Sequence, residues 1–141
     1  VYEEFPWYTT GTTGFVDVRD LAVVMILLME TEISAEKYVV SAHNESYRNL
    51  FNLIADAFNK KRPTKEVTPF LASLVTKIQA IKSLFTKEKP LITKETALTA
   101  MTKTEFSNEK ILAALPDFKF LSLEKTVTDT CEALQQKINR Q

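Results

Sequence analysis

The chain has 141 residues, of which 45% are apolar, with 18 basic and 18 acidic side chains. This length and apolar content suffice for one domain over residues 1–141 with its own hydrophobic core, and they exclude a disordered tail. A formal net charge of zero gives no field that attracts nucleic acid or an anionic membrane, so we expect neither partner. The only cysteine, Cys131, excludes an internal disulfide and favours a structural thiol in the reducing cytoplasm.

The amino-terminal segment is predicted to be a loop followed by a short strand. Residues Phe5–Tyr8 are too aromatic for a solvated tail, and the threonine-rich stretch Thr9–Thr13 has no helical period. A short β-branched run then ends at Val16. The strand therefore leads directly into the strongest helix signal in the sequence.

That signal is a helix start with a built-in cap. Asp17 can accept hydrogen bonds from the first free N–H groups of the helix, and Asp20 places a second carboxylate at the positive end of the dipole in a variant of the capping box. Arg19 is unfavourable at that end, so it predicts a structural ion pair with a flanking carboxylate or, as the alternative, a bound ligand. The helix is predicted to run from about Val18 to Thr31, and its buried stripe to consist of Leu21, Val24, Met25, Leu28 and Met29.

The middle of the chain is predicted to hold a strand and a second helix. A turn over Ile33–Glu36 leads to a strand at Lys37–Ala42, which His43–Glu45 closes. Ser46 is predicted to cap the second helix, which ends before Pro63. The apolar stripe of that helix consists of Leu50, Leu53, Ile54, Ala57 and Phe58.

The carboxyl-terminal half is predicted to be mainly helical. A short strand at Thr64–Val67 precedes a helix over Phe70–Phe85, whose apolar stripe indicates a core face rather than a helix lying on a membrane. Shorter helices follow at Thr93–Met101, at Asn108–Leu115 and after Ser122. The sequence therefore predicts an α+β fold that is mostly helical and has one or two short strands.

Few residues are candidates for catalysis. His43 has no Ser, Cys or Asp at a motif spacing and lacks the further ligands that zinc requires, so we expect a surface or loop histidine and no metal site. Asp17 and Asp20 form a carboxylate pair, but capping is sufficient reason for both. We therefore assign no catalytic residue to this chain.

Three segments resemble the carboxy-terminal half of the extended short-chain dehydrogenase/reductases, the family of NAD-dependent epimerase/dehydratases and dihydroflavonol-reductase-like enzymes. Phe15–Ala22 resembles the Phe-Val-Asp-Val-Arg-Asp-Val-Ala stretch that opens that half. The resemblance continues through Lys37–Ala42, followed by the helix from Ser46, and through Phe106–Ile111. The turn after the third segment departs from the family pattern, because Pro116 stands where glycine is expected.

The parts of the family that hold the cofactor are not found in this sequence. The dinucleotide fingerprint needs three closely spaced glycines, whereas this sequence has only Gly11 and Gly14, and no tyrosine stands four residues before a lysine. The resemblance therefore implies a substrate-binding half without a cofactor site. Its parent enzyme would use NAD(P) to move a hydride to or from a carbonyl or hydroxyl carbon. A first residue other than Met fits an excised fragment, whose partner is the missing N-terminal half.

The resemblance also implies where a substrate binds. In the family, the segment before the strand-to-helix motif lines the substrate cleft, so Trp7, Tyr8 and Phe15 are candidate substrate contacts, with core packing as the open alternative. Nucleotide-sugar enzymes of the family carry an arginine just ahead of this strand, where this sequence has Thr13, Gly14 and Phe15. This difference favours a less charged small molecule as the substrate.

An alternative function belongs to a different class. The chain is then a self-contained helical protein-interaction module, whose apolar stripes bind a protein partner.

If the chain is instead an excised half, the strand at Lys37–Ala42 loses its neighbour and leaves an unpaired edge. For that case we expect the isolated chain to self-associate.

The glycine count generates a direct prediction. We expect the isolated chain to bind neither NAD nor NADP, because its backbone offers no three-glycine turn for a pyrophosphate. Isothermal titration calorimetry measures this binding. A dissociation constant in the micromolar range would contradict the assignment of the chain as the half without the cofactor site.

Overall fold

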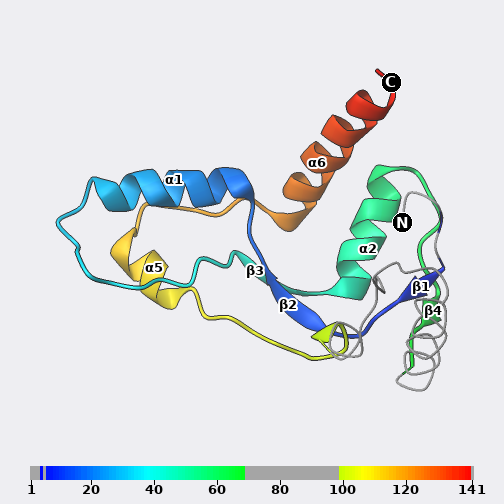
Figure 1. The fold of residues 1–141 in the computed structure, drawn as a ribbon, viewed down its shortest axis with the longest axis horizontal. Coiled ribbons are helices and arrows are strands. Elements are labelled where there is room, and N and C mark those ends of the chain that lie inside the picture. The colour runs from blue at the N-terminus through cyan, green and yellow to red at the C-terminus, as the bar shows by residue number, and fades with distance from the viewer. Residues whose placement is uncertain (1–3, 5, 69–98, 141) are drawn as a thin grey trace, which may run out of the picture.

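The computed structural model describes residues 4, 6–68 and 99–140. Four helices and four short strands lie wholly within these residues and form an α+β fold in which helices provide most of the regular structure. Their order is β1 (Trp7–Tyr8), β2 (Thr12–Phe15), α1 (Val18–Met29), β3 (His43–Ser46), α2 (Tyr47–Ala57), β4 (Lys65–Glu66), α5 (Glu109–Ala114) and α6 (Leu123–Ile138). Figure 1 shows α1 and α5 at one end of the described elements and α2 and α6 at the other, with β2 and β3 between them. The helix predicted over Phe70–Phe85 and most of the one over Thr93–Met101 lie outside the described residues.

The strands form two separate pairs. β2 and β3 run antiparallel, with Phe15 opposite His43. β1 and β4 run parallel, with Trp7 opposite Lys65. β4 lies within the strand predicted at Thr64–Val67, so that prediction is confirmed in position.

The strand predicted at Lys37–Ala42 is wrong, because the observed strand, β3, begins at His43. Pairing with β2 sets this boundary: the Ala42 N–H donates to the Phe15 carbonyl at 2.8 Å, and the paired residues continue from His43. In the described part of the chain, the backbone of residues 38–40 has no hydrogen-bond partner. A β-branched sequence does not form a strand without a neighbour to pair with.

α1 begins at the predicted residue but is buried on one side only. It ends at Met29 rather than Thr31. Val24 is 1% exposed and packs with Ile111 and Leu115, which are also buried. The partly buried residues that complete this first core are Leu27, Leu28, Tyr38, Val40, Phe118 and Phe120. The predicted stripe is wrong at Met25 and Met29, because both side chains are exposed.

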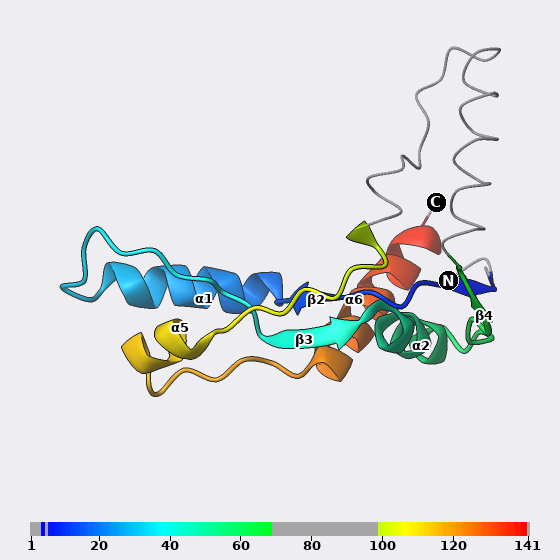
Figure 2. The same ribbon diagram turned by 90° about the horizontal axis from the view of Figure 1, so that it is seen from below.

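A second core joins α2 to α6, and Figure 2 shows these helices away from α1 and α5. Leu123, Val127 and Cys131 supply the buried side chains of α6. Burial raises the pKa of the Cys131 thiol, as expected of a structural cysteine. The partly buried residues packed against them are Phe15, Leu50, Leu53, Ile54, Ala57 and Phe58, so the stripe predicted for α2 is confirmed in full. No helix in the described part of the chain is long and apolar enough to cross a membrane.

Gly11 lies where two backbone segments meet. Its N–H donates to the Ala100 carbonyl at 3.2 Å, and its own carbonyl accepts from the Tyr47 N–H at 3.0 Å. A Cβ at this position would overlap the Ala100 carbonyl oxygen and would lie 2.9 Å from the Thr102 carbonyl oxygen. The approach therefore requires glycine, since backbone atoms cannot rotate away as a side chain can.

We expect Gly11→Ala to lower the free energy of unfolding by about 1–3 kcal/mol, the usual cost of an overpacked site. Gly14→Ala is the matched control, because its added Cβ would meet the side chains of Ser41 and Phe106, which can rotate. Urea unfolding of both variants measures the difference. Equal losses would show that the backbone around Ala100 moves aside as easily as those side chains.

Candidate functional site

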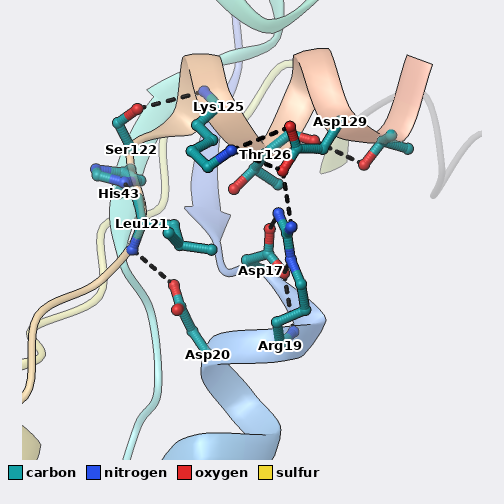
Figure 3. Close-up of polar contacts among 10 residues, drawn as sticks. Asp17, Arg19, Asp20, His43, Leu121, Ser122, Lys125, Thr126 and Asp129 are labelled. Carbon is teal, nitrogen blue, oxygen red and sulfur yellow. Dashed lines mark hydrogen bonds and ion pairs between the residues drawn. The ribbon is translucent and has the colours of Figure 1, made fainter. Parts of the chain in front are cut away.

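Figure 3 shows the N-terminus of α1 held by a closed set of charged side chains. Asp17 occupies the N-cap position, and its Oδ1 accepts from the Arg19 backbone N–H at 2.8 Å. The Arg19 guanidinium donates to both carboxylate oxygens of Asp17, from Nε at 3.0 Å and from Nη2 at 2.7 Å. The structure therefore places the cap and the ion pair where the sequence predicts them.

A third residue extends this set to α6. Nη1 of Arg19 donates to Asp129 Oδ2 at 2.7 Å, and Lys125 Nζ reaches the same oxygen at 3.2 Å. Because α1 and α6 lie near opposite ends of the sequence, the contact fixes two distant elements relative to each other. Sequence reasoning missed Asp129, whose spacing from Lys125 indicates only a surface pair within one helix.

These contacts set the protonation state of Asp17. Hydrogen bonds from Arg19 hold the pKa of Asp17 well below its ordinary range, although burial of the carboxyl acts in the opposite direction. Hydrogen bonds from Arg19 and Lys125 likewise lower the pKa of Asp129. An acid that stays ionised with both oxygens occupied is unsuited to proton transfer near neutral pH, so we assign this cluster a structural role.

Asp20 and His43 hold the backbone of one residue, Leu121, in the segment that leads into α6 (Figure 3). Asp20 is 5% exposed, and its Oδ2 accepts from the Leu121 N–H at 2.8 Å. His43 Nε2 lies 2.7 Å from the Leu121 carbonyl oxygen, which can only accept, so Nε2 is the donor.

Two expectations from the sequence are corrected by these contacts. Asp20 lies in the first turn of α1, as predicted, but its carboxylate binds a distant peptide instead of completing a capping box. His43 is not a loop histidine, because it is the first residue of β3 and makes a defined contact with Leu121. Neither contact has a local signal, since both partners lie far along the chain.

The structure separates the three aromatic residues considered as substrate contacts. Phe15 lies in β2, where its ring meets Tyr47 edge to face with the ring centroids 6.2 Å apart, and it packs against the second core. Trp7 and Tyr8 are neighbours in β1 and therefore point to opposite sides of that strand. Phe15 is thus engaged in packing, and its contact with a substrate stays a prediction.

Each aromatic residue of β1 lies beside a cation. Tyr8 is buried, and the guanidinium carbon of Arg48 lies 4.9 Å from its ring centroid. Trp7 is half-buried, and Lys65 Nζ lies 5.4 Å from its ring centroid. Trp7 is therefore the more accessible ring, and with its cation it can bind an apolar group that carries a polar substituent. Within the described residues, no three or more His, Cys, Asp or Glu side chains are grouped so that they could hold a metal ion.

Comparisons with known proteins give a fold but no family. No family model matches the sequence, and no curated protein matches it. The crystal structure of a protein called gox2253 has a similar fold, with a TM-score of 0.72 and 21% sequence identity. The match covers 96% of this chain and 41% of the gox2253 chain, so this chain spans less than half the length of that protein.

The lowered pKa of Asp17 generates a prediction for stability against pH. The unfolded chain regains the ordinary aspartate pKa of 3.8, so it binds more protons than the folded chain in acid. The contribution of Asp17 to the free energy of unfolding is therefore complete above about pH 5 and is lost as the pH falls further. We expect Asp17→Asn to cost about 1–2 kcal/mol at neutral pH and to flatten this acid dependence.

Ser122→Ala is the matched control for this prediction. Ser122 caps α6 by accepting from the Lys125 N–H at 3.3 Å, and its hydroxyl does not titrate. Its loss is expected to cost about 1 kcal/mol at every pH. Urea unfolding between acid and neutral pH measures both variants, and an acid dependence unchanged in Asp17→Asn would rule out Asp17 as its source.

Proposed function

We propose that this chain is the substrate-binding half of an NAD(P)-dependent oxidoreductase or epimerase of the extended short-chain dehydrogenase/reductase family, and that it is not catalytic alone. The observation that carries the proposal is the extent of the fold match, in which 96% of this chain corresponds to 41% of a longer one. Such a relation is expected of one part of a larger protein. The family assignment rests on the resemblance of Phe15–Ala22, Lys37–Ala42 and Phe106–Ile111.

The charged residues of the Phe15–Ala22 motif support the proposal through their contacts. Asp17 and Arg19 connect the start of α1 to α6, and Asp20 holds the Leu121 peptide. The motif thereby fixes the elements that surround the end of β2. Holding these elements requires a capping residue, an arginine that donates from several nitrogens, and a second carboxylate at this spacing. The family segment that Phe15–Ala22 resembles has the same three residue types in the same order.

Among the residues that the structure describes, neither the two glycines nor the start of α1 fits a dinucleotide. Gly11 packs on the backbone around Ala100, and Gly14 packs on Ser41, so neither glycine leaves room for a phosphate against the backbone. A helix N-terminus can also bind a phosphate, but the N-terminus of α1, which follows the two glycines, is occupied by the Asp17 carboxylate. We therefore assign NAD(P) binding, the catalytic Tyr and Lys of the family, and hydride transfer to the other half of the parent enzyme.

The part of this chain in substrate recognition is proposed to lie at β1. Trp7 is half-buried beside Lys65, and Tyr8 is buried beside Arg48. Phe15 lies in β2 and packs on the second core, so it is kept as a separate predicted contact. A small, largely apolar molecule with a carbonyl or hydroxyl group suits these aromatic surfaces.

The environment of Cys131 supports a cytoplasmic location. The thiol is free and buried, and burial raises its pKa, which disfavours the reactive thiolate. A free structural thiol of this kind suits a reducing compartment.

The proposal is tested on the complete polypeptide that contains this sequence. We expect that polypeptide to bind NAD or NADP and to act on a carbonyl or alcohol substrate, whereas the isolated chain does neither. Trp7→Ala in the complete polypeptide is expected to raise KM by roughly tenfold with a smaller change in kcat. Phe106→Ala is the matched control, since Phe106 is an exposed aromatic residue outside β1. A complete polypeptide that binds neither cofactor would overturn the proposal.

A further inference from the structure

The two cations beside β1 are held by aromatic rings and not by carboxylates. Lys65 lies beside Trp7, and Arg48 lies beside Tyr8. Within the described part of the chain, neither cation makes an ion pair or a side-chain hydrogen bond. Each of four other cations there is paired with a carboxylate, and these are Arg19, Arg62, Lys110 and Lys125. The charge beside β1 is therefore not neutralised by a direct contact with the residues that the structure describes.

Lys110 shows how this fold completes the same arrangement elsewhere. Its Nζ lies 5.0 Å from the ring centroid of Tyr38 and donates to Glu36 Oε2 at 2.6 Å. An aromatic ring, an ammonium group and a carboxylate therefore occur together around Lys110. Trp7 and Lys65 supply the first two of these groups, with Nζ 5.4 Å from the ring centroid, and no described residue supplies the third.

The strand pair keeps the nearest carboxylate in the sequence away from Lys65. β1 and β4 run parallel, with Trp7 opposite Lys65 and Tyr8 opposite Glu66. Because side chains alternate along a strand, Glu66 lies on the face of Tyr8, and Lys65 lies on the face of Trp7. The ammonium group of Lys65 is therefore left to pair with a group from outside this strand pair.

Trp7 and Lys65 are accessible to a ligand, whereas Tyr8 is not. Trp7 is half-buried and Lys65 is exposed, but Tyr8 is only 7% exposed. The indole ring offers a flat apolar surface, and the ammonium group lies at one side of it. A ligand that carries a carboxylate on an apolar body matches both groups, because the carboxylate receives a charge-assisted hydrogen bond while the body covers the ring.

We propose that Trp7 and Lys65 bind a monocarboxylate, with its apolar body on the indole ring and its carboxylate at Lys65 Nζ. This inference rests on the proposed function, which places substrate recognition at β1, and it names the substrate class as an oxo acid or hydroxy acid. Because Lys65 holds the carboxylate, the carbonyl or hydroxyl carbon that reacts is a different part of the molecule. A single carboxylate carries less charge than the diphosphate of a nucleotide sugar, in agreement with the absence of an arginine at residues 13–15.

Nuclear magnetic resonance on the complete polypeptide tests this site without turnover. Benzoate offers a ring and a carboxylate, benzamide offers the ring without the charge, and acetate offers the carboxylate without the ring. The indole N–H resonance of Trp7, identified by its loss in Trp7→Phe, reports binding. We expect benzoate to bind at least about fivefold more tightly than either other probe, because it alone makes both contacts. Benzoate that binds no more tightly than benzamide or acetate, or no shift with any probe, would overturn the proposal.

A pair of variants separates a contact with Lys65 from the net charge of the region. Lys65→Met removes the ammonium group and keeps an unbranched side chain, so we expect benzoate binding to weaken about fivefold, to the level of benzamide, while benzamide binding is unchanged. Lys61→Met is the matched control, because Lys61 is an exposed lysine between α2 and β4 and makes no ion pair within the described residues. Equal weakening of benzoate binding in both variants would show that net charge attracts the carboxylate, and the proposal would be wrong.

Two further outcomes distinguish a failure of this inference from a failure of the proposed function. Preferential binding of benzoate by a complete polypeptide that binds neither NAD nor NADP would overturn the proposed function and leave the carboxylate site. Binding of NAD(P) without a preference for benzoate would overturn the carboxylate site alone.

Discussion

The bidentate ion pair between Asp17 and Arg19 is the contact on which the arrangement of α1 and α6 depends. A single exposed ion pair contributes little to stability, but here the carboxylate is buried, caps a helix and receives two guanidinium donors. The remaining guanidinium nitrogen reaches Asp129. Because α1 belongs to the first core and α6 to the second, this polar contact joins two apolar clusters.

The same reliance on polar side chains explains how the segment before α6 is held. Leu121 lies outside regular structure, so its backbone N–H and carbonyl need partners that no strand or helix supplies. Asp20 accepts from the N–H, and His43 donates to the carbonyl. Asp20 therefore connects the start of α6 to α1, and His43 connects it to β3.

The features predictable from the sequence are those with a local cause. The caps at Asp17 and Ser46 and the apolar stripe of α2 each depend on residues within a few turns, and the structure contains all three. The start of β3 and the role of Asp129 were not predictable, because each depends on a partner distant in sequence. The cations beside the proposed substrate contacts at β1 were not predictable for the same reason, because they come from α2 and β4.

The apolar pattern of α1 predicts that Met25 and Met29 are buried, but both side chains are exposed, and this difference has a physical cause. A sequence predicts burial wherever apolar residues are dense, and α1 is dense on every side. The charged groups at its N-terminus are satisfied within this chain, so what remains to be covered is almost purely apolar. Association through such a surface is driven by loss of hydrated apolar area, and its hallmark is a negative heat-capacity change rather than a strong dependence on salt.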